Sequence, residues 1–320
     1  MGLKVDAPLV SVIMNCYNSG EYLSVAIDSV IAQTYLNWEL IFWDNQSTDD
    51  SAVVFKRYND PRLKYFYSRE HTTLGFARNL AVKEAKGEWI GILDCDDLWH
   101  PEKLECQLND RVMEDGIGVI YSDYNIISSD GIIKRSSRRP TRIFAGDVFN
   151  EMIIEKFTVC WPTVLFRATA LREIGSFAGY KYLEDFDVLL RLAEKHRFNF
   201  VDKKLASYRV HSNQASVNFQ VMLSEKLDIF GKWESKWFES NTLSINRVSL
   251  LSEARAHAYY VAGINAVFYG QSGVDFFAVS IKEKFSKLAV MGFVLSLFGP
   301  KIASGVIKKV RRSLGHGEYY

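Results

Sequence analysis

The chain has 320 residues, of which 48% are hydrophobic and 24% charged, so it can bury a sizeable core as one large domain or two. Its formal net charge of +1 gives no global sign of a nucleic-acid partner. The four cysteines form no CxxC pair, which argues against a zinc site or a disulfide framework and indicates a cytoplasmic protein. No segment approaches the roughly 18 uninterrupted apolar residues of a membrane span, and residues 1–8 lack the apolar core of a signal peptide.

Short apolar runs alternate with helical patterns over the first part of the chain. The predicted elements are strand 9–15, helix 21–32, strand 39–44, helix 49–58, strand 63–68, helix 75–85 and strand 89–94. This alternation predicts βαβ units and a mainly parallel central sheet flanked by helices. No GxGxxG or GxxxxGK[ST] pattern follows the first strand, which argues against a dinucleotide-binding dehydrogenase or a P-loop enzyme.

Polar loops follow the predicted strands at 15–18 and 44–47. Because ligands of such sheets bind beyond the carboxyl ends of the strands, these loops are expected to converge with the residues after the fourth strand. Asp44 is placed to accept hydrogen bonds from a nucleobase or a ribose, although Ser47 or Thr48 next to it can simply cap a helix. Arg78 begins a helix, where it can meet diphosphate oxygens or stay solvated.

The fourth predicted strand leads straight into three carboxylates, Asp94, Asp96 and Asp97. Carboxylates this close repel one another, so a folded protein keeps them together mainly where a cation neutralises them. The alternative is a strand followed by an Asp-capped helix, since Pro101-Glu102 is typical of a helix start. One Asp is enough for a cap, and the run of three favours a divalent ion that holds a phosphorylated substrate.

The rest of the chain has a less regular middle and a helical end. The middle contains a strand near 163–167, a helix from about 183 to 195, and a basic loop formed by Lys134, Arg135, Arg138, Arg139 and Arg142. The pattern becomes helical after Ser216, which predicts domains over 1–216 and 217–320.

Residues 281–312 hold six Lys, two Arg and one Glu, a net +7, around the apolar stretch 288–298. This segment suits an interfacial helix on anionic lipid at the inner face of the plasma membrane, or a core helix with a solvated basic tail.

Several ordered motifs together carry a family resemblance. They are Ser11-Val12-Ile13 with Tyr17-Asn18, Ser29-Val30 with Gln33-Thr34-Tyr35, Glu39-Leu40-Ile41 followed by Asp44 and Ser47-Thr48-Asp49, Gly75 with Ala77-Arg78-Asn79, Leu93-Asp94-Cys95-Asp96-Asp97, Glu184-Asp185 ahead of Leu190-Arg191-Leu192, and Tyr208-Arg209-Val210-His211. With them the chain resembles, from residue 10 to about 216, family 2 glycosyltransferases of the GT-A fold. The nearest types are bacterial enzymes that build lipopolysaccharide O-antigen or capsule.

The resemblance implies a GT-A domain with a helical C-terminal extension, a nucleotide-diphosphate sugar as donor with UDP-sugars favoured, a divalent Mn²⁺ or Mg²⁺ ion, and inversion at the anomeric carbon. The residues implied to contact the donor are Asn15, Tyr17, Asn18, Asp44, Arg78 and Asp94. The residues implied to hold the metal are Asp94, Asp96, Asp97 and His211, with a plain surface histidine as the alternative for the last. Inverting transfer needs a base, for which the resemblance implies Asp185, with Glu184 as a neighbour that orients it or binds the acceptor. Both acids also suit a helix N-terminus.

Departures from the family pattern limit what the resemblance implies. Asn15-Cys16 replaces the usual proline and Asn45-Gln46 stands where Asp-Gly is frequent, so the nucleobase stays open. No Gln-x-x-Arg-Trp follows Asp185, which favours non-processive transfer of one hexosyl or N-acetylhexosaminyl group. The expected acceptor is a glycan or a polyprenyl-diphosphate-linked glycan, whose phosphates the basic loop can meet. The rival functions are a sugar nucleotidyltransferase and a catalytically inactive glycan-binding protein.

Overall fold

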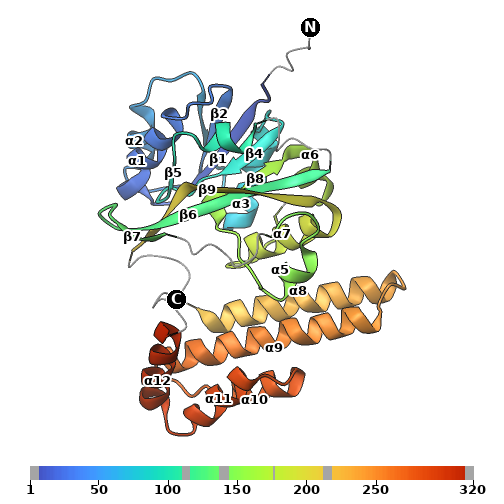
Figure 1. The fold of residues 1–320 in the computed structure, drawn as a ribbon. Coiled ribbons are helices and arrows are strands. Elements are labelled where there is room, and N and C mark those ends of the chain that lie inside the picture. The colour runs from blue at the N-terminus through green and yellow to red at the C-terminus, as the bar shows by residue number, and fades with distance from the viewer. Residues whose placement is uncertain (1–6, 110–115, 137–143, 176, 212–217, 314–320) are drawn as a thin grey trace. The chain divides into compact units, whose positions relative to one another are not determined.

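The computed structural model describes residues 7–109, 116–136, 144–175, 177–211 and 218–313. The chain forms two compact units, the first made of residues 1–149 and 157–214 and the second of residues 150–156 and 215–320. The first unit combines a sheet with helices, and the second is built of helices (Figure 1). None of the helices in the described part of the chain has the length and apolar character needed to span a bilayer.

A mixed sheet forms the centre of the first unit. Over the described residues it has nine strands in the order β3-β2-β1-β4-β8-β6-β9-β5, with β7 paired to β6. The parallel part consists of β1 (Val10–Cys16), β2 (Trp38–Asp44), β3 (Leu63–Tyr67) and β4 (Trp89–Ile92). The mixed part consists of β5 (Leu98–Trp99), β6 (Ile117–Ser128), β7 (Ile133–Ser136), β8 (Leu165–Arg167) and β9 (Arg197–Val210). In it β8 runs antiparallel to β4 and β6, whereas β6 and β9 are parallel.

The predicted alternation of strands and helices over residues 9–94 is confirmed. Helices α1 (Gly20–Ile31), α2 (Ser51–Lys56) and α3 (Leu74–Glu84) connect the four parallel strands, and α4 (Lys103–Gln107), α6 (Ala168–Glu173) and α7 (Glu184–Lys195) follow. β1 and β2 are buried along nearly their whole length, as expected for strands covered on both faces. The parallel arrangement brings the carboxyl ends of β1, β2 and β4 to one edge of the sheet.

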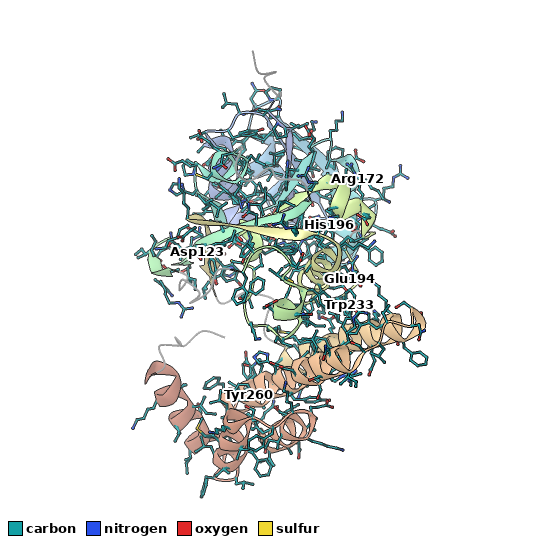
Figure 2. All side chains as sticks on the ribbon, turned by 45° about the vertical axis from the view of Figure 1, so that its right-hand side comes forward. Asp123, Arg172, Glu194, His196, Trp233 and Tyr260 are labelled. Atoms are coloured by element: carbon teal, nitrogen blue, oxygen red, sulfur yellow. The ribbon has the colours of Figure 1, made fainter. Side chains whose placement is uncertain are left out.

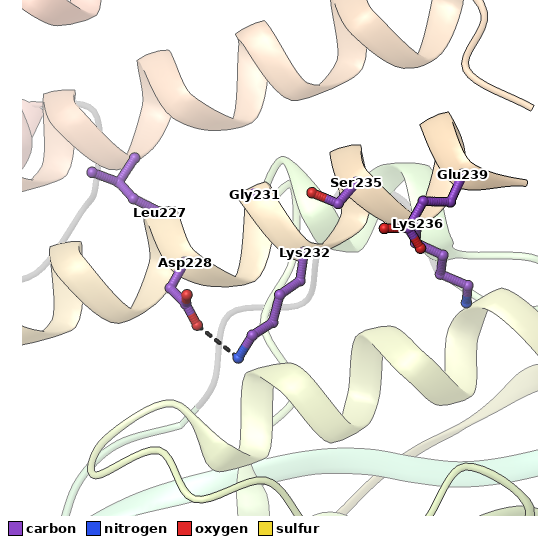
Figure 3. A pocket seen from close by; sticks show the side chains of 7 residues that line it. All are labelled: Leu227, Asp228, Gly231, Lys232, Ser235, Lys236 and Glu239. Atoms are coloured by element: carbon purple, nitrogen blue, oxygen red, sulfur yellow. Dashed lines mark ion pairs between the residues drawn. The ribbon is translucent and has the colours of Figure 1, made fainter. Parts of the chain in front are cut away.

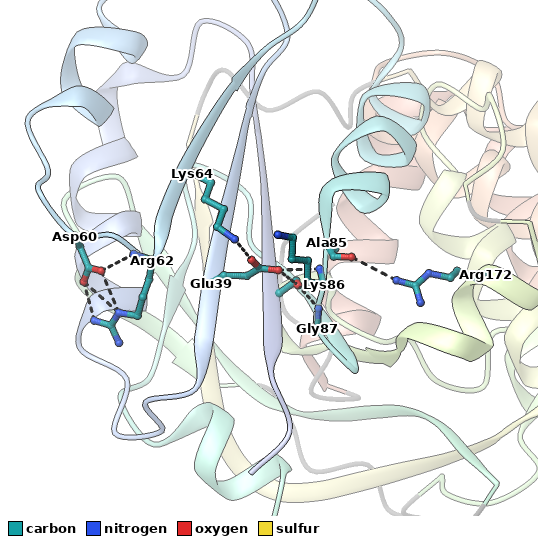
Figure 4. A network of polar contacts seen from close by, with 9 residues as sticks. Glu39, Asp60, Arg62, Lys64, Ala85, Lys86, Gly87 and Arg172 are labelled. Carbon is teal, nitrogen blue, oxygen red and sulfur yellow. Dashed lines mark hydrogen bonds and ion pairs between the residues drawn. The ribbon is translucent and has the colours of Figure 1, made fainter. Parts of the chain in front are cut away.

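A buried polar network ties β1 and β2 to the start of β4 (Figure 4). The Glu39 carboxylate accepts hydrogen bonds from Ser11 Oγ (2.6 Å), from the backbone N–H of Lys86 (2.8 Å) and from Lys64 Nζ. Burial alone would raise the pKa of Glu39, but these donors outweigh it and hold the pKa below its ordinary value. The ionised carboxylate therefore stabilises the folded state.

We expect Glu39→Gln to lower the free energy of unfolding at neutral pH by about 2 kcal/mol, because the amide leaves one of these buried donors unsatisfied. Since the folded pKa is depressed, the contribution of Glu39 is present above the unfolded value near 4.5 and is lost as pH falls through the folded pKa. Urea unfolding of both proteins at pH 7 and below pH 4.5 tests this. A difference that stays constant with pH would contradict it.

The second unit is made of helices packed on α9. Its helices are α8 (Phe219–Glu239), α9 (Ile245–Phe268), α10 (Val274–Glu283), α11 (Lys287–Ser296) and α12 (Pro300–Ser313), and α5 (Phe149–Ile153) lies largely within the short segment 150–156. That segment is held by Lys226 Nζ of α8, which donates to Glu155 Oε1 at 2.7 Å. Burial would raise the pKa of Glu155, but Lys226 and His257 bring it down to about 2.

The centre of the second unit is the fully buried ring of Phe277. Tyr260, labelled in Figure 2, packs against it with 5.9 Å between ring centroids. A Cβ added at Gly263, Gly273 or Gly292 would lie 2.8, 2.8 or 2.6 Å from atoms of this ring. These distances are shorter than any real carbon contact, so glycine is what lets α9 and α11 approach Phe277.

Candidate active site

The loop after β1 is bound to the loop after β2. Asn18 has a positive φ of 50°, and its Oδ1 accepts hydrogen bonds from the backbone N–H of Thr48 (2.7 Å) and of Asp49 (3.3 Å). In return, Ser47 Oγ accepts from the N–H of Asn18 at 3.1 Å. The first two polar loops predicted from the sequence therefore lie side by side.

The loop after β3 closes on the same place. Asn45 Nδ2 donates to the Thr72 carbonyl at 2.8 Å, and the His71 ring lies against Tyr17 with centroids 4.2 Å apart. Tyr17 is half exposed, so one side of its ring is open to a ligand. A half-exposed aromatic ring between polar loops is suited to a flat, polar molecule such as a nucleobase.

Asp44 lies beneath these loops with its side chain fully buried. Its Oδ1 accepts from the N–H of Ser47 (2.7 Å) and its Oδ2 from the Tyr65 hydroxyl (2.7 Å). Oδ1 therefore holds the second loop in place, while Oδ2 ties the end of β2 to β3. Because a carboxylate oxygen can accept more than one hydrogen bond, a contact with the nucleobase stays a prediction.

Asn15, at the end of β1, has a side chain whose polar atoms lack partners. Its Oδ1 and Nδ2 are buried, and neither makes a hydrogen bond within the described residues. A buried amide without partners carries a desolvation cost that a polar ligand would remove. The site predicted for the donor thus contains an unsatisfied group of the kind that a bound molecule satisfies.

The three carboxylates after β4 have different surroundings. Asp96 Oδ2 lies 3.0 Å from His211 Nε2, so the structure brings together two of the residues predicted to bind metal. Asp97 is buried and its Oδ1 accepts from the N–H of Arg209 at 2.8 Å, while burial and the neighbouring charges of Asp96 and Asp94 raise its pKa. This bond connects the turn formed by residues 94–97, called the acidic turn below, to β9. Metal binding by Asp97 stays a prediction.

Arg209 is a positioning residue to which the sequence analysis gave no role. Besides its bond to Asp97, its Nε donates to the Asp96 carbonyl at 2.7 Å, and its guanidinium lies 4.4 Å from the centre of the Tyr22 ring. It thereby fixes the backbone of the acidic turn from β9. Its place between Tyr208 and His211 in one of the resemblance motifs is the signal that was available in the sequence.

Arg78 joins two parts of the site that are far apart in sequence. Its guanidinium donates to Asp94 Oδ1 at 3.0 Å and to Glu184 Oε1 at 2.5 Å, and it packs over the Trp161 ring at 4.8 Å. The Arg78 side chain is only 2% exposed. Burial raises the pKa of Asp94, and Arg78 counteracts that shift. A contact of Arg78 with donor phosphates stays a prediction, whereas its bridge between the acidic turn and α7 is visible directly.

The two acids at the start of α7 differ in what they touch. Glu184 is buried, with Oε1 on Arg78 and Oε2 without a hydrogen-bond partner among the described residues. Asp185 is half-buried, and its Oδ1 accepts from the N–H of Phe186 at 2.6 Å. Burial raises the pKa of both carboxyl groups. A raised pKa makes a carboxylate a better proton acceptor, as a general base requires.

The side chains predicted to bind the metal fit a hard divalent cation only in part. Carboxylates at 94 and 96 with an imidazole next to one of them are suitable ligands, and Mg²⁺ commonly uses one or two carboxylates together with substrate phosphates. Across the described residues, no three His, Cys, Asp or Glu side chains are grouped closely enough to bind a metal without such help.

A pocket on α8, lined by residues between Leu227 and Glu239, contains none of the predicted site residues (Figure 3). Arg138, Arg139 and Arg142 of the predicted basic loop lie outside the described residues.

Comparison with known proteins identifies the family. The pattern of "Glycosyl transferase family 2" matches residues 11–175. The chain is 30% identical over 229 residues, 71% of its length and 87% of the relative's, to the Escherichia coli UDP-Glc:alpha-D-GlcNAc-diphosphoundecaprenol beta-1,3-glucosyltransferase WfgD.

Two solved structures are similar in fold. S. aureus TarS 1-349 has a TM-score of 0.64 at 18% identity, with 97% of this chain and 92% of that chain covered. The mannosyltransferase PcManGT from Pyrobaculum calidifontis, in complex with GDP-Man and Mn²⁺, has a TM-score of 0.56 at 17% identity, with 94% and 87% covered. The chain therefore belongs to family 2 of the glycosyltransferases, has the GT-A fold, and is an enzyme that transfers a sugar from a nucleotide sugar.

Proposed function

We propose that this enzyme is an inverting, metal-dependent, non-processive glycosyltransferase of cell-surface polysaccharide biosynthesis. One observation carries the proposal. The buried Arg78 side chain links Asp94 of the acidic turn to Glu184, which together with Asp185 forms the acid pair at the start of α7. The residues expected to hold the donor and those expected to activate the acceptor thus belong to one connected site.

The donor is a nucleotide-diphosphate sugar, with a UDP-sugar favoured. Support comes from WfgD, whose name specifies UDP-Glc, and from the PcManGT complex with GDP-Man and Mn²⁺. In this chain Tyr17, Asn15 and the loop around Asp44 would bind the nucleoside, and Asp94, Asp96 and His211 would hold the cation. When bound, such a cation neutralises charge on the departing nucleoside diphosphate.

Asp185 acts as the general base. The acceptor hydroxyl gives its proton to the Asp185 carboxylate while its oxygen forms the new bond to the anomeric carbon. The bond from that carbon to the donor phosphate breaks at the same time, and the nucleoside diphosphate leaves on the opposite face, which inverts the configuration. Glu184, which is held by Arg78, orients the neighbouring Asp185.

The acceptor is a glycan linked to a polyprenyl diphosphate at the inner face of the plasma membrane. WfgD supports this assignment, because its name specifies an acceptor on diphosphoundecaprenol. Lys134 and Arg135 on β7 are the described part of the basic loop and would meet the acceptor's phosphates. The C-terminal helices would contact the anionic membrane that holds such an acceptor.

Titration calorimetry with UDP-, GDP- and dTDP-sugars, with and without Mn²⁺ or Mg²⁺, tests the proposal. We expect metal-assisted binding of at least one nucleotide sugar, weakened by Asp96→Asn at least about tenfold, since even groups that only support a metal ligand have effects of that size. Asp60→Asn is the matched control, because Asp60 lies next to the amino end of β3, at the opposite edge of the sheet. Metal-independent binding, or binding of none of these donors, would overturn the proposal.

The reaction product separates this enzyme from the rival nucleotidyltransferase. A glycosyltransferase releases a nucleoside diphosphate, whereas a nucleotidyltransferase releases pyrophosphate. Chromatography of the nucleotide products therefore assigns the reaction directly, and release of pyrophosphate from a sugar phosphate and a nucleoside triphosphate would favour the rival.

A further inference from the structure

Helix α11 packs into the second unit through its smallest residues. Ala289, Gly292 and Ser296, spaced three and four apart, form its buried face. Gly292 lies so close to the Phe277 ring that an added Cβ would be 2.6 Å from it. The small face therefore lies closest to Phe277, and Phe293 and Leu295 of α11 also pack against the surrounding core. Leu288 and Val294 of the same helix remain exposed.

The end of α11 and the turn after it carry exposed apolar side chains. Val294 lies near the end of α11, and Leu297 and Phe298 follow it directly, with 62% of Leu297 and 64% of Phe298 accessible. Phe285, which precedes α11, is 71% accessible, and Ile302 on α12 is exposed as well. We call the set Phe285, Leu288, Val294, Leu297, Phe298 and Ile302 the α11 surface. Soluble proteins rarely leave so many large apolar side chains of one short segment in water without a partner.

Basic residues accompany the α11 surface in sequence and are exposed. Lys282 and Lys284 precede Phe285, Lys287 begins α11, and Lys301 stands next to Ile302. Lys284 Nζ lies 2.6 Å from Glu253 Oε2, so its charge is balanced within the unit. Between residues 281 and 309 the acidic residue is Glu283 alone, against six lysines. The partner of the α11 surface therefore has to combine an apolar interior with negative charge.

An anionic bilayer satisfies both requirements, and a second copy of the chain does not. In a two-fold dimer the α11 surface would meet itself, so the lysines of one copy would face the same lysines of the other. In a bilayer the apolar side chains enter the acyl boundary while the lysines contact anionic headgroups. No charge is left facing a like charge.

We propose that the α11 surface is a membrane-docking face that inserts into the headgroup region of anionic lipid. The proposal rests on the proposed function in one respect, since a lipid-linked acceptor explains why the enzyme would be held at a membrane. It adds which residues make the contact and with which lipid chemistry. Docking is peripheral, with α11 lying in the plane of the interface.

Sedimentation of the full-length protein with vesicles tests this proposal. We expect binding to phosphatidylglycerol-rich vesicles and little binding to pure phosphatidylcholine vesicles. The double variant Leu297→Glu/Phe298→Glu should weaken binding at least about tenfold, since it removes the burial of two large apolar side chains. Lys287→Gln and Lys301→Gln should each weaken binding to the anionic vesicles about fivefold.

The matched control is Phe238→Glu/Ile245→Glu, which places the same charges on two exposed apolar residues of α8 and α9 outside the α11 surface. Equal losses in the control and the test variant, or equal binding to both kinds of vesicle, would overturn the proposal. Self-association of the wild type that disappears in Leu297→Glu/Phe298→Glu would do so too, and would assign the surface to a dimer. Donor binding, measured by calorimetry without vesicles, is expected to be unchanged in all variants. Its absence in the wild type would count against the proposed function alone.

Discussion

Replacing Asp185 by Asn is expected to reduce sugar transfer by about 10²–10⁴-fold while nucleotide-sugar affinity changes only a few-fold. The amide keeps the size of the side chain and can still accept a hydrogen bond from the N–H of Phe186, but it cannot take a proton from the acceptor. Transfer measured as nucleoside diphosphate release with acceptor present, together with donor titration, separates the two effects.

The control for this variant is Glu173→Gln, which neutralises a surface carboxylate paired with Lys195 and should leave transfer unchanged. Near wild-type turnover in Asp185→Asn would remove Asp185 from the mechanism. Glu184→Gln is the informative companion, because it loosens the contact with Arg78 but leaves Asp185 intact. A smaller loss of turnover in Glu184→Gln than in Asp185→Asn would support the orienting role.

Arg78→Ala is expected to have the largest effect on stability, about 3–5 kcal/mol. The variant leaves the buried Glu184 carboxylate and the partly exposed Asp94 without their shared cation, and it opens a space beside Trp161. Arg78→Lys keeps the charge, but a single ammonium cannot reproduce two hydrogen bonds from separate guanidinium nitrogens, so transfer should remain low. Urea unfolding and turnover measure the two consequences.

A surface pair serves as the control for Arg78. Lys232 pairs with Asp228 at 2.8 Å, and both side chains are more than half exposed, so Lys232→Ala should cost less than about 1 kcal/mol. Equal destabilisation by Arg78→Ala and Lys232→Ala would show that the bridge between Asp94 and Glu184 contributes no more than an ordinary surface contact.

The parallel half of the sheet was predictable because its signals are local. Each strand from β1 to β4 is a short apolar run bounded by polar residues, and each connecting helix shows its own periodicity, as in the buried positions Leu23, Ala26, Ile27 and Val30 of α1. The ends shift by a residue or two. The predicted strand 89–94, for example, stops at Ile92, because residues 94–97 form a turn in which the N–H of Asp97 donates to the Asp94 carbonyl.

The mixed half of the sheet was not predictable in the same way. β6 and β9 are long and pair with each other in parallel, although most of the middle region separates them in sequence. β6 is buried along most of its length, whereas β9 mixes exposed, partly buried and buried residues, and their pairing contains register shifts, so no single period marks them. The role of Trp161 was hidden for a similar reason, because a short 3₁₀ segment places it against Arg78 only in the folded protein.

The chain enters its helical unit twice, first at 150–156 and again after residue 214. A fragment that ends near residue 214 would keep Glu155 but lose Lys226, and would leave without its cation a carboxylate whose pKa is about 2 in the intact fold. Truncation at that point is therefore not a clean separation of a catalytic half from an accessory one. Any shortened version of this enzyme has to retain α8 to keep the segment 150–156 anchored.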